Sequence, residues 1–173
     1  MATTYVATPY AAVWDPDSSN LTLVQKGNIE IEVEWGYTEV TDNDHGDMAV
    51  DMISRGIKTC MIRVPVTDHA LSTIEQMLPL TSYFSEGGTR VEFRPNIGTS
   101  LFGLAKELRL QKFTSGAASS DETDWIVAPK AVPTGAFKMT LGNEQSVYTI
   151  EFRCLPDSTN NNRPLFFGDE TAS

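Results

Sequence analysis

The stretch IEIEVEW, residues 29–35, decides the fold, because its apolar and acidic residues alternate strictly. Side chains of a β-strand point to opposite faces in turn. The alternation therefore predicts a strand with one buried face and one face that carries Glu30, Glu32 and Glu34. We expect a half-buried sheet here, with the rest of the chain built onto it.

A second strand is expected downstream at residues 57–66, IKTCMIRVPV, which are rich in β-branched side chains. It runs directly into a helical pattern. Thr67 or Asp68 is expected to cap this helix, because short polar side chains accept hydrogen bonds from the first helical N–H groups. Pro79 is expected to end it.

The helix carries one apolar stripe, which we expect to pack on the sheet. Residues three and four positions apart share a helix face, and a stripe at this spacing is typical of a helix that is buried on one side. The stripe consists of Leu71, Ile74 and Leu78.

A long loop is expected between the two strands, from Thr41 to Gly56, where ordinary hairpin connections take roughly two to five residues. The first half is polar and includes Asp42, Asp44, His45 and Asp47. The second half is too apolar to remain in water, so we expect it to pack on something, such as another subunit. Its apolar residues include Met48, Val50, Met52 and Ile53.

Short segments with strand-like patterns fill most of the remaining chain, with no internal repeat and no second domain. They lie at residues 21–24, 91–94, 105–113, 125–127, 136–141 and 146–155. We expect residues 21–24 to form an antiparallel pair with the 29–35 strand through a turn at 25–28.

We expect arms at the two ends, because both are polar and rich in turn-forming residues. Residues 1–20 are interpreted as an N-terminal arm, and residues 157–173 as a C-terminal arm whose residues 164–169 dock as a terminal strand. The fold class expected is mainly β: a single domain of β-sandwich or barrel-forming sheets, with one α-helix packed on the side and a long inter-strand loop.

Charge and hydropathy exclude some classes of partner. The 173-residue chain has a formal charge of -10, with 23 acidic against 13 basic residues, whereas tight binding to phosphate backbones needs clusters of Lys and Arg. No apolar run approaches the roughly 20 residues that span a bilayer, and the N-terminus does not resemble a signal peptide. We expect a soluble protein without a membrane partner. Cys60 and Cys154 are expected as two buried thiols rather than a disulfide.

Acidic residues cluster around the expected loop, which raises the question of a metal site. Asp42, Asp44, His45, Asp47 and Asp51 are close in sequence. A calcium loop aligned on Gly46 would place Met52 where a bidentate acid is needed. We therefore interpret the cluster as a solvated loop, and we expect no metal, no cofactor and no enzymatic activity.

Several of these segments together resemble the major tail tube proteins of long-tailed bacteriophages. The resemblance rests on the 29–35 strand, the loop with its Asp51-x-x-x-Arg55-Gly56 end, the 57–66 strand and the helix that ends Met77-Leu78-Pro79. The final strand with Pro156-Asp157 and the terminal Phe167-Gly168-Asp169 are also similar. The resemblance covers about half of the chain, as a pattern rather than as identity.

The resemblance implies a structural virion protein without enzymatic activity. Six copies would form a ring, their inner sheets would join into a barrel, and rings would stack through the long loop into a tube. The implied partners are other copies of the chain and the tail terminator, baseplate and tape-measure proteins. DNA would pass through without specific binding, and the protein would be assembled in the host cytoplasm and located in the virion tail.

The resemblance also suggests roles for residues and leaves alternatives. Glu30, Glu32 and Glu34 are expected to line the lumen, with the outer wall as the second possibility, because an acidic wall does not hold DNA in place. The alternatives are a secretion-tube ring protein, a tail-completion or baseplate-hub protein of the same fold, or a monomeric β-sandwich binding module.

Overall fold

A computed structural model of the chain describes residues 9–44, 48–78, 80–94, 97–140, 142 and 146–172, except for the Tyr83 side chain. The described chain is mainly β with one α-helix, as the sequence predicts. The strands are β1 (Tyr10–Trp14), β2 (Leu21–Leu23), β3 (Glu30–Thr41), β4 (Ala49–Val66), β5 (Thr81–Phe84), β6 (Arg90–Phe93), β7 (Lys106–Thr114), β8 (Ala117–Ala118), β9 (Trp125–Thr134), β10 (Tyr148–Cys154) and β11 (Phe166–Phe167). The helix is α1 (Leu71–Met77), and 3-10 turns lie at η1 (Phe102–Leu104), η2 (Glu122–Asp124) and η3 (Ser158–Asn160).

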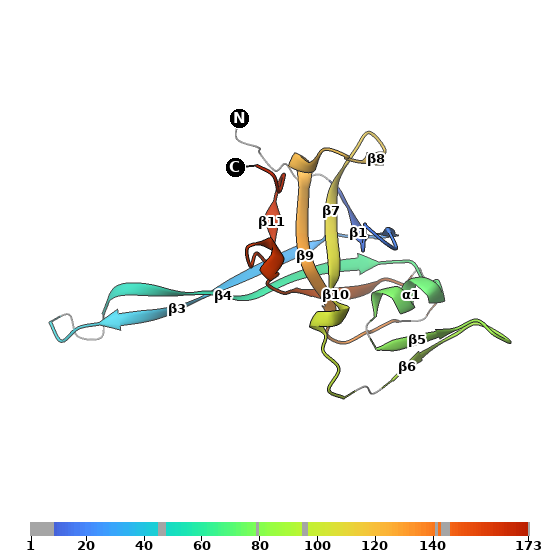
Figure 1. The fold of residues 1–173 in the computed structure, drawn as a ribbon, viewed down its shortest axis with the longest axis horizontal. Helices are drawn as coiled ribbons and strands as arrows, with labels where there is room; N and C mark the ends of the chain where they lie inside the picture. Colours follow the sequence, from blue (N-terminus) through green and yellow to red (C-terminus); the bar gives the residue numbers. More distant parts are fainter. Residues whose placement is uncertain are drawn as a thin grey trace.

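The main sheet is antiparallel and has the order β2-β1-β7-β9-β10-β4-β3, while β11 pairs with β9 and β8 with β7. A separate two-stranded sheet is formed by β5 and β6. In Figure 1, β7 and β9 run steeply across β3, β4 and β10, so the two ends of the main sheet face different ways. The sheet therefore folds over itself in a β-sandwich-like arrangement.

One hydrophobic core lies between the two halves of the main sheet. Trp14 of β1 and Phe152 of β10 meet there, with their ring centroids 5.0 Å apart. Both side chains are buried, together with Ile62 and Val64 of β4 and Leu108 of β7. Alternate residues are buried in β10 and in the second half of β4, so the period-two pattern of these segments corresponds to real burial in the body of the protein. By contrast, β9 is buried almost continuously.

The N-terminal segment differs from the expected arm. Residues 10–14 form β1, which lies between β2 and β7 and places Ala12, Val13 and Trp14 in the core. The sequence reasoning missed this strand because its partner β7 is about a hundred residues away, and nothing local marks the pairing. Residues 1–8 lie outside the described part of the chain.

The expected hairpin between residues 21–24 and 29–35 is also wrong. The short strand β2 pairs with β1, with Val13 opposite Thr22, and lies at the far end of the main sheet from β3. Residues 25–28 instead connect the two ends of the sheet, and Gln25 bridges to Val66 of β4. A turn-like sequence alone does not fix which neighbour a strand takes.

Two other expected boundaries change. Residues 136–140 are not a strand, whereas β9 extends to Thr134, well beyond the predicted 125–127. Residues 49–56 belong to β4 and are not loop. The expected strands at 105–113, 146–155 and 164–169 correspond to β7, β10 and β11.

The helix begins later than predicted, at Leu71, because the preceding residues are used elsewhere. The Thr67 backbone N–H donates to the Val24 carbonyl at 2.8 Å, which keeps the chain extended. Asp68 still acts near the helix start: its carboxylate accepts from the Ala70 N–H at 2.9 Å and from the Thr73 hydroxyl at 2.8 Å. The last helical residue is Met77, and Pro79 lies outside the described residues.

The buried face of α1 is turned relative to the predicted stripe. Ile74 is buried as expected and Leu78 is half-buried, but Leu71 is 39% exposed. Thr73 and Met77 are buried instead. At about 100° per residue, Leu71 points away from Thr73 and Met77, so its predicted packing on the sheet is wrong.

Candidate assembly surface

The most prominent surface feature is the outer part of the hairpin formed by β3 and β4. Figure 1 shows the two strands leaving the body together and extending far beyond every other element. We call residues 35–57 the projecting hairpin. Within it, Trp35 is paired with Ile57, and the last pair before the tip joins Thr41 to Ala49.

The projecting hairpin exposes large apolar side chains. Trp35 is 64% exposed, Tyr37 57%, Met52 55% and Ile53 56%. Large side chains of this kind are usually buried, and their accumulation on one projecting element is typical of an interaction surface. The other exposed apolar residues of the hairpin are Met48, Val50 and Ile57.

The apolar side chains lie on both faces of the two-stranded ribbon. Residues directly opposite each other in an antiparallel pair share a face, and successive residues alternate. Met52 is opposite Glu39 and Ile53 is opposite Thr38, so Met52 and Ile53 point to opposite faces. A single covering surface would leave one of them in water, and the ribbon would be buried fully only between two surfaces.

An irregular stretch of the two strands separates the projecting hairpin from the body. Gly36 and Gly56 lie opposite each other, and the register shifts between Glu34 and Trp35 and again between Gly36 and Tyr37. Gly56 has φ +82°, a conformation that other residues rarely adopt. Irregularities of this kind bend and twist a ribbon. They explain why the simple alternation of residues 29–35 does not continue along the strand.

The three glutamates of the alternating stretch share the outward face of β3, as predicted, but each is paired with a cation. The Arg63 guanidinium of β4 lies 2.7 Å from Glu32, 3.9 Å from Glu30 and 3.1 Å from Glu151 of β10. The hydrogen bonds to Glu32 and Glu151 raise the pKa of Arg63. Three carboxylates share one guanidinium, so the cluster keeps a net negative charge.

Glu34 belongs to a second ion pair at the base of the projecting hairpin. Lys58 Nζ lies 2.7 Å from its carboxylate, and the Thr59 hydroxyl donates to the other oxygen at 3.2 Å. The hydrogen bonds from Lys58 and Thr59 lower the pKa of Glu34. The face is therefore acidic but partly neutralised, rather than a stripe of free carboxylates.

The acidic residues near the tip do not assemble into a metal site within the described part of the chain. The Asp42 carboxylate accepts a hydrogen bond from the Asp44 N–H at 3.0 Å, and Asp51 accepts one from the Met52 N–H at 2.7 Å. Both contacts are local, the first between residues two apart in the chain and the second between neighbours within β4. His45 and Asp47, also predicted for this segment, lie outside the described residues.

The main strand order ends at β3 on one side and β2 on the other, and each of these two strands has only one strand partner among the described residues. An open edge presents backbone N–H and C=O groups that can pair with another chain. The β3 edge is the longer of the two, because β3 spans twelve residues and β2 three. A second copy of the chain could extend the sheet at these edges.

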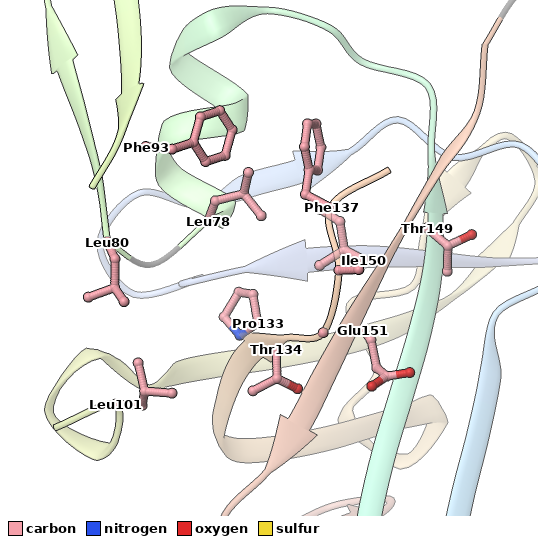
Figure 2. Close-up of a pocket in the computed structure, with 12 residues that line it drawn as sticks. Leu78, Leu80, Phe93, Leu101, Pro133, Thr134, Phe137, Thr149, Ile150 and Glu151 are labelled. Atoms are coloured by element: carbon pink, nitrogen blue, oxygen red, sulfur yellow. The ribbon is translucent and has the colours of Figure 1, made fainter. Parts of the chain in front are cut away.

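A groove of about 390 Å³ lies on the body, away from the projecting hairpin. Figure 2 shows Leu78, Leu80, Phe93, Leu101 and Phe137 around it, with the Glu151 carboxylate at another side. Phe93 and Phe137 stack with centroids 5.9 Å apart. The Glu151 carboxylate is already held by Arg63, and the rest of this lining is largely apolar, so the groove does not bring catalytic groups together.

Comparison with known proteins does not assign this chain to a family. No protein-family model matches the sequence, and no curated protein matches it either. In the part of the chain that is described, no helix has the length and hydropathy needed to cross a membrane.

The sequence analysis missed several residues of this surface. Trp35 and Ile57 lie in predicted strands but are not predicted to be exposed, Tyr37 is not assigned, and Arg63 is not connected to the glutamates. The sequence does contain a signal for the first three: apolar residues continue beyond the alternating stretch on both sides of the acidic tip, which would have suggested a longer hairpin. The partners of Arg63 depend on strand register, for which the sequence carries no comparable signal.

Proposed function

We propose that this chain is a structural subunit that forms hexameric rings, and that the rings stack into the tail tube through which phage DNA passes. The observation that carries the proposal is the projecting hairpin with apolar side chains on both faces. A monomer in solution would leave these side chains in water. Insertion between two neighbouring subunits would bury both faces, as ring stacking requires.

The sheet edges also support assembly. The open edges of β2 and β3 would be paired if the sheets of neighbouring subunits joined, which removes the liability of an unpaired edge. The number of copies and the DNA-conducting role come from the resemblance of the sequence pattern to tail tube proteins. We also propose that the Glu30, Glu32 and Glu34 face lines the lumen, because the three side chains share one outward face of β3.

Electron microscopy of the purified full-length chain tests the proposal. We expect hollow tubes or six-fold rings at high protein concentration. A persistent monomer under conditions in which the chain is folded would contradict the proposal and favour a monomeric binding module.

A shortened variant tests the role of the projecting hairpin. Residues 38–53 are replaced by Asn-Gly, which forms a two-residue turn between the paired Tyr37 and Ser54. We expect a folded monomer that does not form tubes, because the body keeps its core. The control is Leu71→Ser, which removes an exposed apolar side chain elsewhere and should leave tubes intact. Tubes of normal length from the shortened variant would refute stacking through this element.

A further inference from the structure

Two cysteines from distant parts of the sequence face each other in the core. Cys60 lies on β4 and Cys154 on β10, and both are free and buried. The antiparallel register pairs Arg153 with Met61, so one step further along it places Cys154 opposite Cys60. The two side chains share a hydrogen bond. Their positions are thus fixed by the sheet and not by flexible loops.

The backbone spacing of such a pair suits a disulfide. Directly opposite residues in an antiparallel pair have Cα atoms about 4.5–5.5 Å apart. Disulfides usually join Cα atoms about 4.4–6.8 Å apart. The Cβ atoms of such a pair lie about 4.5–5.5 Å apart and must approach to about 3.5–4.5 Å in a disulfide. A bond between Cys60 and Cys154 therefore needs only a small local shift of the two strands and the loss of the two thiol hydrogens.

A small oxidant has a route to the pair. A cavity of about 320 Å³ is lined by Cys60 and Cys154, and also by Lys58, Arg153 and Pro164. A water molecule occupies roughly 30 Å³, so a molecule the size of hydrogen peroxide fits. Lys58 Nζ is held by Glu34 at 2.7 Å, and Arg153 alternates to the opposite face of β10 from Cys154, so the interaction between the two thiols, rather than a cation, favours the thiolate form.

We propose that Cys60 and Cys154 are a redox-sensitive pair that a hydroperoxide converts into a cross-strand disulfide. The disulfide fastens β4 to β10 close to Gly56, where the projecting hairpin leaves the body. The site does not depend on tube formation, and it operates in the isolated subunit.

The two thiols have different parts in the reaction. The hydrogen bond that Cys154 donates lowers the pKa of Cys60, whereas its bond with Cys60 and its burial raise the pKa of Cys154. We assign the first attack to Cys60, and the two single variants below test this assignment. Its thiolate attacks one peroxide oxygen, the O–O bond breaks, and with one proton the other oxygen leaves as water, giving a sulfenic acid. The Cys154 sulfur then attacks the Cys60 sulfur, its proton joins the departing hydroxyl, and a second water leaves.

Mass spectrometry of the folded, full-length chain tests the proposal. The reduced protein is treated with hydrogen peroxide, quenched with catalase, unfolded and alkylated. We expect a monomer that has lost two hydrogen atoms and takes up no alkylating agent, with a melting temperature raised by roughly 10 °C, because the bond closes a long loop. The same treatment of the chain unfolded in guanidinium shows that the oxidant is active. The unfolded chain should also be oxidised, but without the preference for a disulfide within one chain.

Single variants separate the roles of the two sulfurs. In Cys154→Ser the sulfenic acid has no partner, so dimedone should label Cys60, while Cys60→Ser should give much less labelling of Cys154. Circular dichroism checks that each variant is folded. If a variant does not fold, the oxidation of the wild-type chain alone tests the proposal. Unchanged thiols, disulfide-linked dimers or sulfinic acid as the main product of the folded wild type would overturn the proposal.

Discussion

Tyr148 shows how one buried side chain holds the body together. It is fully buried on β10, and its hydroxyl donates to the Asp68 backbone carbonyl just before α1. Its ring meets Phe137 edge-on at 5.3 Å and His69 at 5.5 Å. Burial, and then the charge of Asp68, raise the pKa of Tyr148 to about 12. The hydroxyl therefore ties the start of the helix to the sheet only while it keeps its proton.

This raised pKa predicts a loss of stability at alkaline pH. In the unfolded chain the hydroxyl ionises near 10.0, whereas the folded state keeps its proton up to about 12. The folded state thus binds more protons in this window, and its free energy of unfolding falls by on the order of 2 kcal/mol as pH rises through it. Tyr148→Phe should lose about 1 kcal/mol at neutral pH and show a flatter profile above pH 10.

Urea unfolding at a series of pH values measures both effects. Tyr37→Phe is the control, because Tyr37 is exposed on the projecting hairpin and its removal should leave the alkaline profile unchanged. An equally steep loss in wild type and Tyr148→Phe would show that another group is responsible.

Arg63 shows what the sequence does not reveal about single residues. The alternating stretch predicts the outward face of Glu30, Glu32 and Glu34, and the structure has them on one face of β3. The cation that binds two of them lies on β4, and a third carboxylate reaches it from β10. These contacts depend on the register between strands that are far apart in the sequence. Local alternation carries no information about that register.

At the scale of elements, α1 predicts a clear contrast between two apolar residues. Met77 is fully buried, whereas Leu71 is partly exposed at the first helical position. Met77→Ala should reduce the free energy of unfolding by about 2–5 kcal/mol, because it leaves a cavity in the core. Leu71→Ala should change it by about 0.5 kcal/mol or less. Urea denaturation measures the free energy of unfolding of both variants. Similar losses would show that Leu71 packs on the sheet, as the sequence predicts.

The projecting hairpin was only partly predictable as an element. The sequence indicates two strands with an apolar segment between them, and the structure contains both. The expected loop from Thr41 to Gly56 is too long, because residues 49–56 are paired with β3. The bulges near Gly36 and Gly56 break the period-two pattern, and a strand exposed on both faces has no alternation of buried and polar residues. Pattern reasoning therefore mistakes it for loop.

At the scale of the whole molecule, the mainly β class and the single helix follow from composition and alternation, but the order of strands does not. The body places β1 beside β7 and β10 beside β4, so its sheet joins segments from both halves of the chain. The open edges and the projecting hairpin become visible only once this order is known. Both are central to the proposed assembly.

The proposed tube predicts a role for the acidic face as a whole. Replacing Glu30, Glu32 and Glu34 by Gln should leave tube formation intact, because the projecting hairpin is unchanged. DNA delivery by particles built from this variant should fall, since a less negative wall repels phosphate less. The matched control replaces Glu86 and Glu170, which lie in turns, and Glu122 of η2. Equal infectivity of particles built from the triple variant and from wild type would place this face on the outer wall.

The strand order also has a consequence for how the chain folds. The β3–β4 hairpin joins neighbouring segments and can form early during synthesis. By contrast, β1 can pair with β7, and β4 with β10, only after the later strand has been synthesised. Contacts between distant segments slow folding, because a long loop must close before they form. A nascent chain would thus expose the apolar side chains of this hairpin before its core can close. Several chains synthesised close together would favour misassembly at this stage. Slow translation, or a chaperone that covers the projecting hairpin, would raise the yield of correctly folded subunits.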